Sequence, residues 1–193
     1  MQIGNGMEQA RSTRMSRGEF RRWCAEQGGK RYERVDGEPV AMSPETRGHT
    51  RLKYRIWQAL DAAVVDLGLP CEVVGDGATV EIDDEIDYEP DVSVECGESV
   101  SGKELNVRNP VIVVEVLSRG TRSVDSGEKI GEYFKVPSIM HYLICHADKK
   151  MVVHLRRSDG QWNTTMVPGG MLTLDPPGVT INLDDIYRKS KIG

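Results

Sequence analysis

One glutamate interrupts an otherwise apolar run of seven residues, which reads VIVVEVL at positions 111–117. The run has the length of a strand and is rich in β-branched residues, so it predicts a strand buried on both faces. Burying a lone carboxylate costs several kcal/mol unless the group is paired, protonated or bound to a metal. The fold must therefore bring a partner to Glu115, and the nearby candidates are Asp91, at the start of another short strand, and Lys129, in a predicted helix.

The composition is that of a single soluble domain. The chain has 193 residues, of which 38% are hydrophobic and 28% charged, and this length suits one full core. No apolar stretch approaches the ~18 residues that cross a membrane, and the N-terminus lacks the apolar core of a signal peptide. We therefore expect a flexible tail over residues 1–15, one domain over residues 16–193, and a cytoplasmic protein without membrane contact.

Charge is unevenly distributed along the chain, whose net charge is −5. Residues 1–60 hold 12 basic and 7 acidic side chains, whereas residues 61–193 hold 13 and 23. The basic third could face phosphates and the acidic remainder could concentrate divalent cations. The simpler interpretation is that most of these charges are solvated.

Four cysteines are scattered through the chain and form no CxxC pair, which argues against structural zinc and against a disulfide framework. We expect buried free thiols at Cys24, Cys71, Cys96 and Cys145.

Local patterns predict the order of the elements. A capping box at Ser16 and Glu19 opens a helix that ends near Gln27, and Asp36-Gly37 marks a hairpin between two short strands. Apolar residues at helical spacing predict a long helix after residues 43–45. Strands are then predicted at 71–74, 78–82, 91–96, 111–117, 140–145, 151–156 and 162–167, with a helix at 123–135 and one helical turn near 183–187. This order favours an α/β (α+β) fold, a mixed central β-sheet flanked by helices.

Asp91 and Glu115 are hard oxygen ligands of the kind that hold Mg²⁺ or Mn²⁺. If their strands are adjacent, both carboxylates can reach one ion, and the main-chain carbonyl of Val116 can supply a third oxygen. A metal lowers the pKa of a bound water, and Lys129 could orient that water and stabilise negative charge on phosphorus. These parts are sufficient for phosphodiester hydrolysis.

Simpler interpretations remain open for each residue. Glu115 and Lys129 could form a structural ion pair, and Lys129 could instead pair with Asp125, four residues earlier on the same helix, for only ~0.3–0.5 kcal/mol. Asp91, which follows a proline, could be an ordinary strand-start or turn residue.

An ordered set of residues resembles a known family. Pro90-Asp91 followed by Glu115-Val116-Leu117 is similar to the PD-(D/E)XK nuclease superfamily, although Leu117 stands where that pattern has lysine. The departure, together with further residues in matching order, resembles the Uma-type family of restriction endonucleases, a former domain of unknown function. The further residues are Met42-Ser43-Pro44, His49, Ser118, Thr121-Arg122, Asp125, Gly127-Glu128-Lys129, Tyr133 and Val136-Pro137-Ser138.

The resemblance implies a restriction-endonuclease-like fold and a Mg²⁺- or Mn²⁺-dependent endonuclease acting on DNA. It implies that the missing lysine has moved to the following helix as Lys129, and that an early acidic residue, Glu38, reaches the metal site. The family usually has proline at Arg119 and often a basic residue at Glu89, so Glu89 would add negative charge where DNA approaches.

Several roles stay open at this point. Glu38 could be a hairpin surface residue, His49 could contact phosphate, transfer a proton or only pack, and Tyr133 could support Lys129. The alternative function is a nucleic-acid-binding protein that keeps the nuclease fold but catalyses little, and a third is a protein with only an internal ion pair. Cleaving both DNA strands needs two active sites, so a homodimer is plausible on symmetry grounds.

Overall fold

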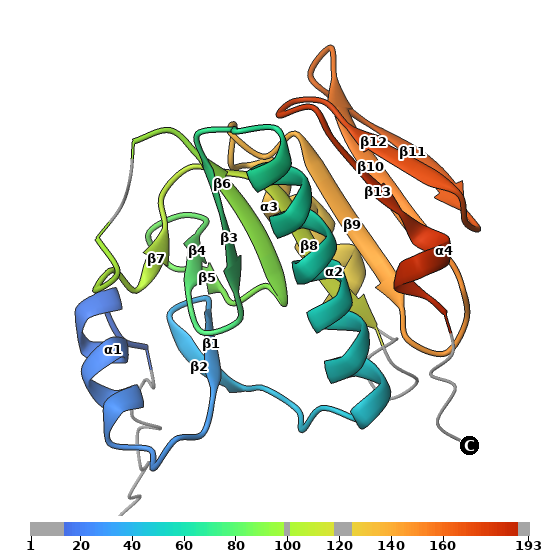
Figure 1. Ribbon diagram of the computed structural model, residues 1–193. Helices are drawn as coiled ribbons and strands as arrows, with labels where there is room; N and C mark the ends of the chain where they lie inside the picture. Colours follow the sequence, from blue (N-terminus) through green and yellow to red (C-terminus); the bar gives the residue numbers. More distant parts are fainter. Residues whose placement is uncertain (1–13, 99–100, 118–124, 189–193) are drawn as a thin grey trace, which may run out of the picture.

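The computed structural model describes residues 14–98, 101–117 and 125–188 (Figure 1). Within these ranges the helices are α1 (Arg17–Ala25), α2 (Arg47–Asp66), α3 (Asp125–Phe134) and α4 (Leu183–Ile186). The strands are β1 (Tyr32–Val35), β2 (Glu38–Ala41), β3 (Cys71–Gly75), β4 (Thr79–Glu81), β5 (Asp87–Tyr88), β6 (Val92–Cys96), β7 (Asn106–Val107), β8 (Pro110–Leu117), β9 (His141–His146), β10 (Val152–Ser158), β11 (Gln161–Val167), β12 (Met171–Leu174) and β13 (Val179–Asn182).

A six-stranded sheet forms the centre, in the order β11-β10-β9-β8-β6-β3. The pair β8–β9 is parallel and the other neighbours are antiparallel, so the sheet is mixed. A second sheet, β2-β1-β5-β4-β7, carries the N-terminal hairpin, and β12 and β13 form a two-stranded sheet. The predicted mixed sheet flanked by helices is confirmed.

The strand with the interrupted apolar run, β8, is buried on both faces. Ile112, Val114 and Val116 join one apolar cluster with α2, whereas Val113 joins another cluster with Tyr133 of α3. Because successive side chains of a strand point to opposite faces, the two helices cover opposite faces of the sheet, with α2 in front of it in Figure 1. Glu115 shares its face with Val113 and therefore points toward α3.

The N-terminal elements follow their predicted signals. Ser16 accepts from the backbone of Glu19, whose carboxylate bonds back to the Ser16 amide, so the capping box is formed. Asp36 and Gly37 have φ of 51° and 76°, the left-handed conformations that a tight hairpin turn requires. Residues 1–13 of the predicted flexible tail lie outside the described residues. In the rest of it, Arg14 pairs with Glu85 and Met15 donates to the Gly37 carbonyl at 2.8 Å.

The expectation of free thiols is wrong for two of the four cysteines. Cys71 and Cys96 form a disulfide, because the antiparallel register of β3 and β6 places them directly opposite each other. Their separation of 25 residues gave no sign of this pairing. Cys145 is buried and free, and Cys24 is half-buried and free.

Some strands escaped sequence prediction. The two-residue strands β5 and β7 are too short to show alternation, and β12 and β13 lie in a segment rich in glycine and proline. Leu172, Leu174 and Ile181 of this last hairpin pack into the same cluster as α2. No helix among the described residues is long and apolar enough to cross a membrane.

Candidate active site

Asp91 and Glu115 come together because β6 and β8 are antiparallel neighbours. The register pairs Val92 with Val114, which brings Asp91 beside the end of β8 that holds Glu115. Asp91 is 6% exposed, and its Oδ2 accepts a hydrogen bond of 2.7 Å from the Val116 amide. The N–H and C=O groups of one residue in such a strand point to the same neighbour, so the Val116 carbonyl also lies on the Asp91 side.

Lys129 reaches Glu115 from α3. Its Nζ donates to Glu115 Oε1 at 3.2 Å and to Glu33 Oε1 at 2.8 Å. Tyr133, one turn later on α3, donates to the same Glu115 oxygen at 3.0 Å. Both hydrogen bonds go to Oε1, which leaves the lone pairs of Glu115 Oε2 for another partner. The side chain of Asp125, the other candidate partner of Lys129, lies outside the described residues, as do Ser118, Arg119, Thr121, Arg122 and Ser123.

Burial dominates the electrostatics of this group. It raises the pKa of Glu115 to about 7, with Asp91 and Glu33 acting in the same direction and Lys129 opposing them. Burial by itself would lower the pKa of Lys129, but the charges of Glu115 and Glu33 outweigh it and the net pKa is raised. Lys129 therefore remains a firm positive charge between two carboxyl groups, and burial keeps Tyr133 a neutral donor by raising its pKa.

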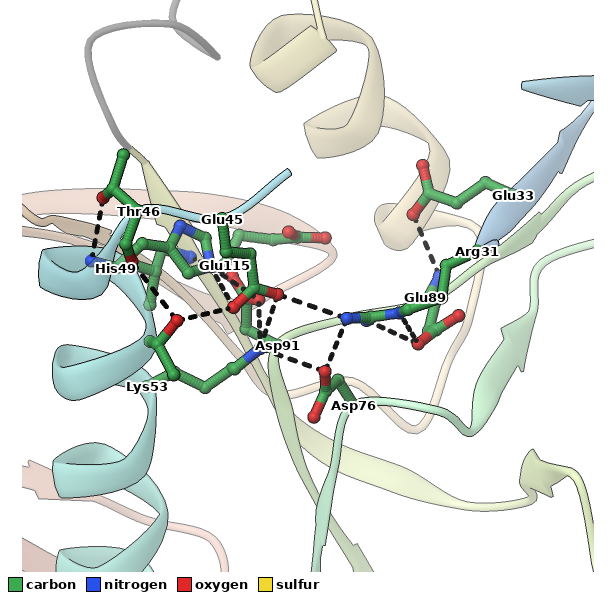
Figure 2. A network of polar contacts seen from close by, with 12 residues as sticks. Arg31, Glu33, Glu45, Thr46, His49, Lys53, Asp76, Glu89, Asp91 and Glu115 are labelled. Carbon is green, nitrogen blue, oxygen red and sulfur yellow. Dashed lines mark hydrogen bonds and ion pairs between the residues drawn. The ribbon is translucent and has the colours of Figure 1, made fainter. Parts of the chain in front are cut away.

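A second polar network reaches Asp91 from the start of α2 (Figure 2). His49 and Lys53 lie one turn apart on one side of α2, and Glu45 reaches them from the segment just before the N-cap, Thr46. His49 Nε2 lies 3.0 Å from Asp91 Oδ1 and 3.8 Å from Glu45 Oε2. Lys53 Nζ lies 2.6 Å from Glu45 Oε1 and 3.7 Å from Asp91 Oδ1.

His49 is buried and held by acidic neighbours. Burial lowers the pKa of its imidazole, but the hydrogen bond and charge of Asp91, with the charge of Glu45, outweigh that effect and the net pKa is raised. Its ring faces Asp91 rather than solvent, which distinguishes it from a surface residue of the helix.

Arg31 closes the network on its far side. Its guanidinium pairs with Glu45 at 3.2 Å, Asp76 at 2.6 Å and Glu89 at 2.5 Å. Glu89 is 7% exposed, and its amide donates to Glu33, which ties the two networks together. The expectation that Glu89 adds negative charge toward DNA is therefore wrong, because Arg31 neutralises this carboxylate inside the protein.

The networks line a pocket of about 130 Å³. Its titratable lining residues are Glu33, Glu45, His49, Asp91, Glu115, Lys129 and Tyr142, and Val116 also lines it. Ligand atoms of Glu45, His49 and Asp91 lie within 4.8 Å of one another, a spacing that a metal ion could bridge. Asp91 thus belongs to two candidate ligand sets, one with Glu115 and Val116 and one with Glu45 and His49.

The structure brings Asp91, Glu115, Val116 and Lys129 together but places Glu38 elsewhere. Glu38 lies on β2, where it pairs with Val35 of β1. Its side chain is exposed and does not line the pocket. Its role stays a prediction.

The acidic residue from the N-terminal hairpin that lines the pocket is Glu33. Sequence reasoning missed Glu33, Glu45, Lys53, Asp76 and Arg31. The spacing of His49 and Lys53 by one helical turn was the one available signal.

The match to a family model covers most of the chain. Residues 17–184 match a model described as "Uma2: Putative restriction endonuclease". The chain belongs to the Uma2 family. The resemblance predicted from the ordered motifs is thus confirmed.

Two sequence relatives and one solved structure are similar to this Uma2 chain over most of its length. It is 28% identical over 178 residues to the uncharacterised protein slr1290 of Synechocystis, covering 91% of this chain and 92% of the relative. It is 26% identical over 147 residues to the uncharacterised protein sll1609 of the same organism, covering 75% and 82%. A crystal structure of "a putative nuclease belonging to DUF820" from Anabaena variabilis superposes with a TM-score of 0.69 at 12% identity, covering 90% of this chain and 97% of the other. This last similarity shows the fold.

Proposed function

We propose that this Uma2 chain is a metal-dependent nuclease that hydrolyses phosphodiester bonds in DNA. The observation that carries the proposal is the meeting of Asp91, Glu115 and Lys129, buried charged groups from two adjacent strands and a helix, at the wall of one pocket. Membership of a family described as restriction endonucleases supports nuclease chemistry. The ion, the preference for DNA and the residue roles are our assignments.

The donor atoms suit a hard divalent cation. The carboxylates of Asp91 and Glu115 and the carbonyl of Val116 are oxygen ligands, the type that Mg²⁺ and Mn²⁺ prefer. When bound, the ion would lower the pKa of a water molecule and offset charge on the phosphate. The second ligand set, with Glu45 and His49, includes an imidazole and would suit Mn²⁺ better than Mg²⁺.

Lys129 is assigned the role of orienting the attacking water and stabilising charge on the phosphoryl oxygens. An ammonium has three N–H donors, and Glu115 and Glu33 occupy two of them. The Nζ also lies 4.8 Å from the centroid of the Tyr88 ring, and we assign its third N–H to water or phosphate. Such preorganised charge needs no rearrangement during the reaction and is typically worth about 10²–10³ in rate.

Glu33, Tyr133 and His49 are assigned positioning roles. Glu33 and Glu115 hold Lys129 from two sides, and the Tyr133 hydroxyl fixes Glu115 Oε1. His49 engages Asp91 Oδ1 while the Val116 amide engages Oδ2, so the plane of the Asp91 carboxylate is set by the protein.

The proposal is tested by titrating Mn²⁺ calorimetrically and by measuring cleavage of supercoiled plasmid DNA. Glu115→Gln should abolish stoichiometric Mn²⁺ binding and, like Asp91→Asn, should lower cleavage by about 10²–10³ or more. His49→Gln tells the ligand sets apart, because it should weaken Mn²⁺ binding strongly only if imidazole is a ligand. Glu72→Gln, at an exposed glutamate on β3, is the matched control. Wild-type cleavage by both Glu115→Gln and Asp91→Asn would refute the assignment.

A second candidate function is DNA binding with little catalysis. The observation that favours it is that the buried carboxylates already have partners in the chain: Asp91 has His49 and the Val116 amide, and Glu115 has Lys129 and Tyr133. This function predicts DNA binding without metal-dependent cleavage. If the protein only keeps an internal ion pair, Glu115→Gln should chiefly lower stability and Mn²⁺ should not bind.

A further inference from the structure

A groove beside the candidate active site is lined mainly by basic side chains. It has a volume of about 290 Å³, and five of its lining residues are basic while one, Asp148, is acidic. We call it the basic groove, and its basic residues are Arg51, Arg55, Lys149, Lys150 and Arg188. This excess stands out in a chain whose net charge is −5.

The basic groove joins three segments that are distant in sequence. Arg51 and Arg55 lie on α2, Lys149 and Lys150 lie in the turn between β9 and β10, and Arg188 follows α4. Arg47, one turn before Arg51, extends the row on α2 toward the start of the helix. At a rise of 1.5 Å per residue the arginine row spans about 12 Å, the length that about three or four phosphates of one B-DNA strand occupy.

Part of this charge is not used by the protein itself. Within the described part of the chain, Arg47 and Arg51 are exposed and no ion pair or hydrogen bond involves either side chain, and the same holds for Lys149. Lys150 pairs with Asp184, and Arg55 donates to the carbonyls of α4 and its end. Among exposed cations elsewhere in the described residues, Arg14, Arg108 and Lys135 each pair with a carboxylate, whereas Lys30 and Lys103 do not.

The basic groove shares no lining residue with the active-site pocket but borders it at two points. Gly48 lines the groove and the next residue, His49, lines the pocket. On the sheet side, Ala147 lines the groove and its amide donates to the carbonyl of Leu117, which lines the pocket, at 2.8 Å. A chain of negative charges lying in the groove would therefore enter the pocket past the start of α2.

We propose that the basic groove binds the phosphodiester backbone of duplex DNA and guides one strand into the pocket, an inference that rests on the proposed nuclease function. Arg47 and Arg51, one helical turn apart, and Lys149 from the facing turn supply unpaired positive charge beside the pocket, which suits a polyanion. Binding through such contacts releases counterions, so affinity falls with salt in proportion to the number of phosphates contacted.

The test measures DNA binding separately from chemistry. Fluorescence anisotropy with a labelled 20-base-pair duplex, in the Glu115→Gln background without metal, compares the triple variant Arg47→Gln/Arg51→Gln/Lys149→Gln with the unchanged groove. We expect the triple variant to bind at least about tenfold more weakly, and the slope of log K against log salt to fall in magnitude by about 2–3. The control is Lys103→Gln, at an exposed lysine outside the groove. It should change the affinity and the salt slope by no more than the loss of about one phosphate contact would.

Outcomes separate this proposal from the proposed function. With Glu115 intact, the triple variant should cleave DNA more slowly yet hydrolyse the small phosphodiester bis(p-nitrophenyl) phosphate at the wild-type rate. Unchanged DNA affinity and salt slope in the triple variant would overturn the groove assignment, even if the wild type cleaves DNA. Loss of binding to vesicles of phosphatidylglycerol, with DNA binding unchanged, would also overturn it. Groove-dependent DNA binding without any cleavage would support the groove and refute the nuclease.

Discussion

A cavity lies at each end of β6, and the larger of the two is not the candidate active site. At the Cys96 end lies a hollow of about 400 Å³ lined by Glu72, Glu95, Glu98 and the Cys71–Cys96 disulfide. At the Asp91 end lies the much smaller pocket of about 130 Å³. The larger hollow has three carboxylates and no basic residue in its lining, and Glu72 and Glu98 are exposed to solvent.

The free energy needed to bury charged side chains differs between the two ends of β6. Exposed carboxylates are solvated and require no partner, whereas buried charges cost several kcal/mol each unless the structure compensates them. The chain carries that cost at Asp91, at Lys129 and at Glu115, whose side chain is 13% exposed, and surrounds them with hydrogen bonds. Burial of charge does not mark a site by itself, because the Cys96 end also buries Glu95, whose Oε2 accepts from the Arg108 amide at 2.9 Å, and Arg34 and Asp87 form a buried pair outside the pocket. The Asp91 end is distinguished by several buried charges that converge on one pocket, and not by its volume.

The largest effect expected from this comparison is on stability at the Asp91 end. Lys129→Met should lower the free energy of unfolding by about 3–5 kcal/mol, because it leaves Glu33 and Glu115 buried without a cation. Chemical denaturation measures the change, and Mn²⁺ should restore part of it if the site binds metal. The control Lys103→Met, at an exposed position, should stay within about 0.5 kcal/mol. Equal stability of the two variants would mean that the buried charges are not energetically distinct.

The next effect is expected at the Cys96 end. The double variant Cys71→Ala/Cys96→Ala opens a loop closed across a separation of 25 residues, and should cost about 3 kcal/mol of stability through chain entropy. Plasmid cleavage by the variant, measured well below its melting temperature, should match the wild type. The comparison fails if cleavage falls in proportion to stability, because the two ends of β6 would then act as one unit.

Much of this architecture could be predicted from local signals. The apolar run identified β8 as a strand buried on both faces, and Ser16 with Glu19 predicted the start of α1. Such features depend on residues that are near in sequence. The pairing of Glu115 with Lys129 could also be predicted as an option, because a buried carboxylate demands a partner and few cations follow the strand.

Features that depend on register and on long-range ion pairs could not be predicted. Cys71 meets Cys96 because two strands happen to align those positions. Lys53 falls outside the apolar stripe of α2, so its position predicts an exposed side chain. It is only 4% exposed, because carboxylates from two separate segments, Glu45 and Asp76, pair with it. β1 buries Glu33 and Arg34 in succession, which breaks the alternation that a sequence pattern assumes.

The smallest expected effect decides between two glutamates of the N-terminal hairpin. Glu33→Gln weakens one of the two contacts that hold Lys129, so cleavage should fall by about tenfold, the equivalent of about 1.4 kcal/mol. Glu38→Gln changes an exposed side chain outside the pocket lining and should alter cleavage less than about twofold if Glu33 is the acid that matters. Plasmid cleavage rates at saturating Mg²⁺ measure both. If Glu38→Gln lowered cleavage more than Glu33→Gln, Glu38 would return to the proposed site. The hairpin would then have to rearrange when DNA binds, because Glu33 on β1 contacts Lys129 whereas Glu38 on β2 lies outside the pocket.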